Sequence, residues 1–182
     1  DMGVNYIAIR EMTRDRNKAG EIFTNCVVLR ILFGIVTFIG IALTINIISS
    51  SREVITATYI SGLAVVIFFW GDIFSDIFKA YERMELEAIS AFWQETFYLL
   101  FVLVTLKFDW GLNGIFIALV WSYMARIIYG FLLTFRKFFL PSLKINISMC
   151  IFLFKEGLPF GISRILRKVS FNMDTILIKL MR

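Results

Sequence analysis

The sequence of 182 residues contains no histidine and only two cysteines, Cys26 and Cys150. Without histidine, the usual general base beside a serine or cysteine nucleophile is missing. The two cysteines lie far apart in apolar stretches and form no metal-ligand or redox motif, so we expect them to be small packing residues. The sequence also lacks the glycine loop with a lysine that cradles nucleotide phosphates. We therefore expect a protein that is not an enzyme and has no cofactor.

Charge is scarce as well. Charged residues make up 18% of the chain and hydrophobic residues 59%, with a mean hydropathy of +0.79. Soluble domains contain only about 45–50% apolar residues, and a soluble protein of this size could not bury so much apolar surface. The net charge of +5 would suggest nucleic-acid binding in a soluble protein. Here it better fits the basic cytoplasmic loops of a membrane protein, so we expect no nucleic-acid partner.

The longest uncharged run covers the 21 residues 31–51, between Arg30 and Arg52. At 1.5 Å per residue, a helix of this length spans about 30 Å, the thickness of the hydrocarbon core of a bilayer. The run shows no polar face, which predicts a transmembrane helix over about 21–49. Further apolar runs predict spans over about 55–79, 88–106 and 112–135. The expected fold is an all-α, polytopic transmembrane helical bundle.

The loops between these spans differ in charge. Eleven Lys and Arg residues lie in the segment up to Arg30, the loop near 79–87 and the connection 136–155, against two in the intervening turns. Because cytoplasmic loops carry the excess of Lys and Arg, the first, third and fifth of these segments are predicted to be cytoplasmic. The expected location is the cell membrane, with several passes.

The region after residue 137 is interrupted by Pro141 and Lys144, which leaves ten uncharged residues, 145–154. Ten residues are too few to span a bilayer. We therefore predict a cytoplasmic or interfacial connection over 138–158 and a last helix over 159–182. Because the chain starts without Met and ends inside a helical pattern, we expect a fragment with this helix truncated.

The last predicted helix carries a basic face. At 100° per residue, its charged residues fall within one arc of about 140°. The residues on this arc are Arg164, Arg167, Lys168, Phe171, Asp174, Thr175, Lys179 and Arg182. Two interpretations remain open: an amphipathic helix held on the cytoplasmic leaflet by anionic lipids, or a spanning helix whose basic face lines a water-filled cavity.

Two charges, Glu95 and Arg126, lie well inside predicted spans. A charge at this depth costs several kcal/mol, so it normally faces a partner or water. The two residues belong to adjacent spans and could form a structural ion pair, or they could face a cavity. In either case we expect both to point to the interior of the bundle.

A polar stripe follows the second span. Spacings of four, three and four residues place its members on one helix face. The members are Asp72, Asp76, Lys79 and Arg83. The stripe is either a solvated face with helical ion pairs or the polar lining at the mouth of a cavity.

Three short motifs follow each other along the chain. The first comprises residues 1–3 with 10–15, before a predicted span, the second residues 78–84 followed by Ala88 and Ile89, and the third residues 157–160 with 174–177. Together they resemble the polysaccharide-biosynthesis flippases of the multidrug/oligosaccharidyl-lipid/polysaccharide exporter superfamily. The second motif resembles that family's cytoplasmic turn after the fourth span, and the third resembles the opening of its seventh span. The order and spacing of the motifs agree along the whole chain.

The resemblance implies two lobes of six helices around a central cavity. Residues 1–137 would belong to the N-terminal lobe, and 159–182 would start the second lobe. It also implies transport of a lipid-linked oligosaccharide or polysaccharide repeat unit from the cytoplasmic to the outer leaflet. The implied partners are this substrate, membrane lipids and glycan assembly proteins. A multidrug exporter of the same superfamily and a non-transporting membrane scaffold subunit remain as alternatives.

The resemblance further implies that the last helix lines the cavity, where cations would hold an anionic pyrophosphate or acidic sugars. Arg164 and Arg167 are then the leading substrate-binding candidates, with Lys168 and Asp174 in supporting roles. The intramembrane charges Arg126 and Glu95 complete the predicted site. No metal is expected.

Overall fold

The computed structural model describes residues 3–48, 51–142 and 144–180, with side chains described up to Ser170. Every regular element in these ranges is helical, which confirms the all-α fold. The elements are α1 (Val4–Arg14), the short 3₁₀ helix η1 (Arg16–Lys18), α2 (Ala19–Ile48), α3 (Arg52–Ala80), α4 (Met84–Lys107), α5 (Gly111–Lys137) and α6 (Ile147–Leu180).

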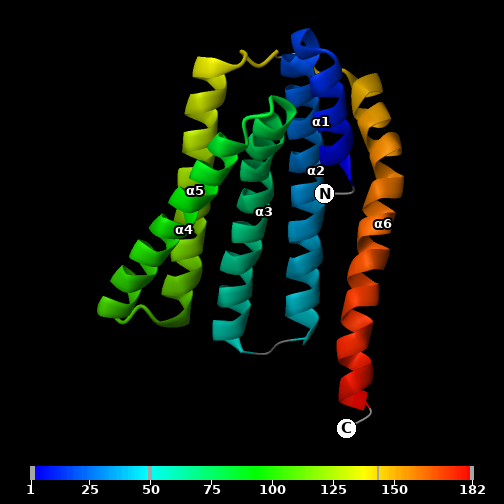
Figure 1. The fold of residues 1–182 in the computed structure, drawn as a ribbon. Coiled ribbons are helices and arrows are strands. Elements are labelled where there is room, and N and C mark those ends of the chain that lie inside the picture. The colour runs from blue at the N-terminus through cyan, green and yellow to red at the C-terminus, as the bar shows by residue number, and fades with distance from the viewer. Residues whose placement is uncertain (1–2, 49–50, 143, 181–182) are drawn as a thin grey trace.

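The helices α2 to α5 are long and apolar enough to cross a membrane. Their bounds lie within a few residues of the four predicted spans, because uncharged runs of this length set both the beginning and the end of a spanning helix. The four helices run up and down in sequence order (Figure 1). The start of α2, the α3–α4 turn and the α5–α6 connection therefore lie at one end of the bundle.

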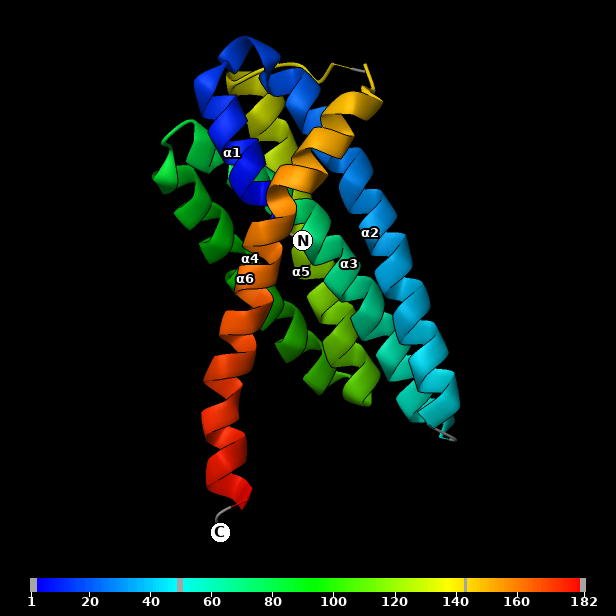
Figure 2. The same cartoon turned by 90° about the vertical axis from the view of Figure 1, so that its right-hand side faces the viewer.

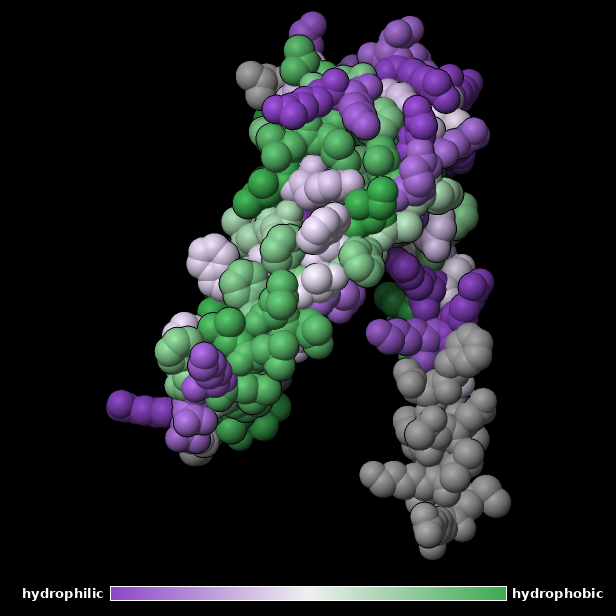
Figure 3. Space-filling view, turned by 60° about the vertical axis from the view of Figure 1, so that its left-hand side comes forward, coloured by the Kyte–Doolittle hydropathy of each residue, from purple (hydrophilic) through white to green (hydrophobic). Residues whose placement is uncertain are grey.

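The surface of the bundle is apolar along its middle and charged at its ends. Large hydrophobic side chains such as Val36 on α2, Leu99 on α4 and Ile128 on α5 are exposed. Figure 3 shows the same division, with hydrophobic residues over the body and hydrophilic residues concentrated at the two ends. This distribution matches a bundle whose sides contact lipid and whose ends contact water.

The central helix is α3. It packs against both α2 and α5, and α4 packs mainly on α5. The close approach of α3 to α5 requires a glycine, because a Cβ atom at Gly130 would lie 2.5 Å from the ring of Phe74. The helices α2 and α5 both pack on α3, and they meet each other where the rings of Phe23 and Phe135 lie edge to face, with centroids 6.5 Å apart.

The first helix, α1, folds back along α2 and packs between α3 and α6 (Figures 1 and 2). It buries Ile7 and Met12 in the core with Phe78 and Leu153. Its start approaches α6 very closely at Gly3, whose φ is +74°. A Cβ atom at Gly3 would lie 2.2 Å from the carbonyl oxygen of Gly157, so this contact excludes a larger residue.

The last helix begins earlier than the sequence pattern predicts. We expected a connection over 138–158 and a helix from Pro159, but α6 begins at Ile147 and Pro159 lies inside it. The side chain of Asn146 caps this start, since its Oδ1 accepts a hydrogen bond of 3.3 Å from the backbone N of Met149. Proline is common in the first turn of a helix but also occurs inside helices, at kinks. The prediction that a helix begins at Pro159 was therefore wrong.

Candidate functional site

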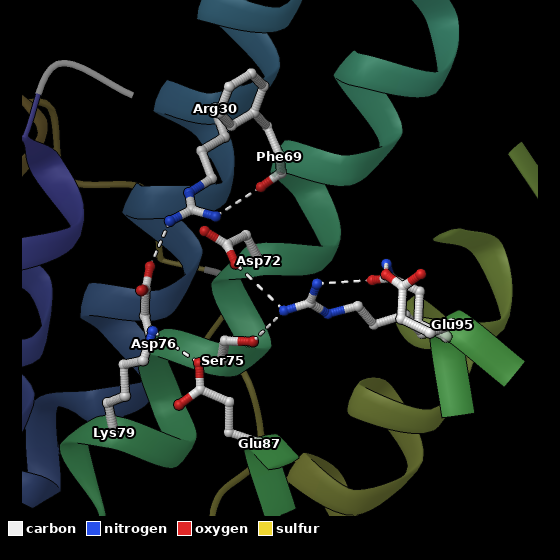
Figure 4. Close-up of polar contacts among 10 residues, drawn as sticks. Arg30, Phe69, Asp72, Ser75, Asp76, Lys79, Glu87 and Glu95 are labelled. Carbon is white, nitrogen blue, oxygen red and sulfur yellow. Dashed lines mark hydrogen bonds and ion pairs between the residues drawn. The ribbon is translucent and has the colours of Figure 1, made fainter. Parts of the chain in front are cut away.

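Arg30 and Asp76 form a buried ion pair between α2 and α3 (Figure 4). The Nη2 of Arg30 donates to Oδ2 of Asp76, and its Nη1 donates to the carbonyl oxygen of Phe69 at 2.6 Å. The exposed fraction is 6% for the Arg30 side chain and 3% for that of Asp76. Opposite charges this deep in a spanning bundle compensate each other, since either one alone would be costly there.

Arg126 of α5 forms a second group of polar contacts, beside the Arg30–Asp76 pair. Its Nη1 donates to Oε1 of Gln94 at 2.7 Å, and its Nη2 donates to Oγ of Ser75 at 2.6 Å. Nη2 also lies 3.4 Å from Oδ1 of Asp72, and the guanidinium carbon lies 5.6 Å from the ring centroid of Phe68. The Arg126 side chain is 10% exposed. The predicted interior position of Arg126 is therefore confirmed, and its partners join α3, α4 and α5.

Glu95 differs from its prediction. It is exposed on α4, so the expected interior position is wrong within the described part of the bundle. The acidic side chain that pairs with Arg126 belongs to Asp72 instead. Gln94 lies between Arg126 and Glu95: its Oε1 accepts from Arg126, and its Nε2 donates to Oε1 of Glu95 at 2.9 Å. Adjacent helical residues point about 100° apart, so the rotation that buries Gln94 turns Glu95 outwards.

The polar stripe on α3 does not form one solvated face. Asp72 and Asp76 point to arginines of neighbouring helices, and Lys79 pairs with Glu87 of α4 at 2.8 Å. At the end of the stripe, Arg83 is exposed and pairs with Glu85 at 3.0 Å. The ion pairs of Asp72, Asp76 and Lys79 therefore run between helices, and they hold α3 to three neighbours.

Sequence reasoning missed the role of Arg30. The sequence pattern places Arg30 at the boundary of an uncharged run, whereas α2 begins at Ala19 and places Arg30 three turns inside the helix. The signal was present in the helix length. The spanning segment covers 33 residues, and a bilayer needs only about 20, so a charge near one end can still lie within the bundle.

The predicted basic face lies on a separate part of the structure. Arg164, Arg167 and Lys168 are exposed on α6, and Arg164 lies where this helix still contacts α1. The guanidinium carbon of Arg164 lies 6.0 Å from the ring centroid of Tyr6. Asp174 lies outside the residues whose side chains are described. Figure 3 shows hydrophilic side chains on α6, directly before the grey atoms, beside an opening between this helix and the apolar bundle.

The chemistry available in these two places is electrostatic. The bundle holds paired charges at fixed positions, and α6 presents three neighbouring cations. Among the side chains described, those of residues 3–48, 51–142 and 144–170, no group of three or more Cys, Asp or Glu is placed to hold a metal ion. Arginine and lysine at this spacing suit an anionic group such as a phosphate, for which arginine supplies two parallel donors.

A comparison with known proteins agrees with the resemblance noted in the sequence. The family model described as polysaccharide biosynthesis protein matches residues 1–182. No curated protein and no solved structure matches the chain.

Proposed function

This chain belongs to the polysaccharide biosynthesis protein family, and from that premise we propose that it carries a lipid-linked glycan across the membrane. The substrate would be a lipid-linked oligosaccharide or polysaccharide repeat unit. It would move from the cytoplasmic to the outer leaflet of the cell membrane. In this proposal the protein is a transporter and not an enzyme. Its partners are the glycan lipid, the surrounding lipids and proteins of glycan assembly.

One observation carries this proposal: α6 is long enough to cross a bilayer and exposes adjacent cations beside the apolar bundle. The helix has 34 residues, which is about 50 Å at 1.5 Å per residue. Arg164, Arg167 and Lys168 are all exposed on it. Cations at this position would compensate the charge of a pyrophosphate as it crosses a region of low dielectric constant.

The proposed roles differ between the two parts of the site. Arg164 and Arg167 would bind the anionic group of the substrate, with Lys168 and Asp174 supporting them. Arg126 already has hydrogen-bond partners on α3 and α4, so we propose that it positions these helices. Glu95, exposed next to Gln94, remains a candidate for contact with polar groups of the substrate.

The test is the double variant Arg164→Ala/Arg167→Ala in the intact protein, with complementation of glycan export at matched expression. A hydrogen bond to a charged group contributes about 1.5–3 kcal/mol, so we expect each substitution to reduce export by about tenfold or more. Lys107→Ala, which removes an exposed cation at the end of α4, is the control and should export normally.

The two interpretations of α6 predict different results. If the helix only lay on an anionic membrane surface, each lost charge would weaken anchoring by about 1 kcal/mol, and export would change little. Full export by the double variant would therefore contradict the proposed role. It would favour a surface helix, as expected of a scaffold subunit.

A further inference from the structure

An apolar pocket of about 390 Å³ lies between α2 and α5. Its floor is formed by α3, because α2 and α5 both pack on α3 and leave a space between each other. The main lining side chains are Val27, Ile31, Trp70, Phe74, Phe131 and Phe135. Binding pockets for small molecules typically measure 300–1,000 Å³ and are mostly apolar, so this one is large enough for part of a ligand.

The pocket opens on the outside of the bundle. Trp70 and Phe131 line it and are also exposed on the surface of the spanning helices. In a membrane, the medium outside these helices is hydrocarbon. A lipid chain can therefore enter the pocket directly from the membrane, without passing through water.

The position of the pocket along the spanning helices places it in one leaflet of the membrane. Its lining comes from the early part of α2 and from the ends of α3 and α5, which meet at the same end of the bundle (Figure 1). Pro141, in the connection after α5, also lines it. The excess of Lys and Arg predicts that this end is cytoplasmic. The pocket thus lies in the half of the membrane that faces the cytoplasm.

Two basic residues lie at the same end of the bundle as the pocket. Arg136 belongs to the last turn of α5, directly after Phe135 of the lining, and Lys144 lies in the connection that follows, three residues after Pro141. Both side chains are exposed. Each basic residue near a membrane surface attracts anionic lipids, so the charge at this end complements an anionic headgroup.

We propose that this pocket binds a hydrocarbon chain of an anionic, phosphate-headed lipid from the cytoplasmic leaflet, with the headgroup at Arg136 and Lys144. This inference goes beyond the transport function and stands whether or not the chain carries a glycan. A phospholipid and the polyprenyl phosphate of a glycan carrier share the required chemistry, and the experiment below separates them.

The test places the photo-crosslinker p-benzoylphenylalanine at Phe131 of the intact protein and identifies the lipid adducts by mass spectrometry. The protein is held in phosphatidylcholine nanodiscs that contain roughly one-tenth phosphatidylglycerol or, in a second arm, polyprenyl phosphate. We expect the anionic lipid to be enriched about fivefold or more among the adducts, relative to its share of the membrane. The same crosslinker at Phe92, exposed on α4, should report the membrane composition.

Two pairs of variants test whether the crosslinked lipid occupies the pocket. Val27→Phe fills the space and should abolish the enrichment, whereas Val104→Phe, on the exposed face of α4, should leave it unchanged. Arg136→Gln with Lys144→Gln should remove the preference for the anionic lipid. Arg52→Gln with Lys107→Gln, at the opposite end of the bundle, should retain it.

Enrichment in either lipid arm supports the proposal and names the source of the ligand. Adducts at Phe131 that follow the membrane composition, as those at Phe92 should, would overturn it. A crosslink from Phe131 to a protein segment would also overturn it, because that segment would then occupy the pocket. If the Phe131 variant does not fold, Ile31 on the opposite wall provides a second crosslinking position.

Discussion

Arg30 and Asp76 illustrate how single residues fix the position of a helix in this bundle. The two side chains are almost completely buried and share a hydrogen-bonded ion pair. Either charge without its partner would be buried with no water to solvate it, so the two residues must lie together. It therefore favours the one arrangement of α2 and α3 in which the two charges are paired.

This pair leads to a prediction for stability. Arg30→Met or Asp76→Leu alone leaves one buried charge uncompensated and should destabilise the protein by about 3–5 kcal/mol. The double variant replaces both charges with apolar groups and should recover most of this loss. Thermal unfolding of the purified protein in detergent would measure the three effects.

The control is the exposed pair Arg83 and Glu85, for which the same double-mutant cycle should give a negligible coupling, because water screens both charges. Additive losses at Arg30 and Asp76, with no recovery in the double variant, would contradict the role of the ion pair.

At the scale of elements, the packing of α3 on α5 depends on small residues. A Cβ atom at Gly130 would lie within 2.8 Å of three atoms of Phe74. Small residues at such contacts let the backbones approach, which is the main source of helix association in lipid. The same logic applies where Gly3 meets α6 at Gly157.

We therefore expect Gly130→Ala to separate α3 from α5 and to destabilise the protein by about 1–3 kcal/mol. Gly40→Ala is a matched control, because no atom lies within 4 Å of a Cβ at that position in α2. It should be neutral or slightly stabilising, since alanine favours a helix more than glycine does. Equal effects of the two substitutions in thermal unfolding would show that the α3–α5 contact tolerates a methyl group.

The whole molecule has two regions with different exposure. The helices α2 to α5 form the apolar bundle, whereas the later part of α6 projects away from it (Figures 1 and 2). The contacts of α6 with α1 and α2 come from the first half of α6. Arg164, Arg167 and Lys168 are exposed, as the proposed transport role requires.

The orientation of the whole molecule is tested by cysteine labelling. In a background without Cys26 and Cys150, Ser51→Cys should react only from outside the cell, and Lys144→Cys only from the cytoplasmic side. This expectation follows from the excess of Lys and Arg at the end of the bundle that contains Lys144. Labelling of both positions from the same side would refute the topology.

The sequence by itself determined the four spanning helices and their order. Uncharged runs between charged residues are local features, and the thickness of a bilayer converts their length directly into a helix. The family could also be recognised from three motifs in register, and the match over residues 1–182 confirms it. The cationic face of α6 is another local pattern, and its described members Arg164, Arg167 and Lys168 are exposed.

Only the tertiary structure decided how these helices face each other. The partner of Arg126 is Asp72 and not Glu95, because the rotation of α4 directs Gln94 inwards. Arg30 finds Asp76 across 46 positions of the chain. Asn146, which caps the start of α6, is held by a hydrogen bond from its backbone N to Oδ1 of Asn25 on α2, a partner that no local pattern contains. Helix rotation and pairing arise from side chains far apart in the sequence, and hydropathy along the chain carries no information about them.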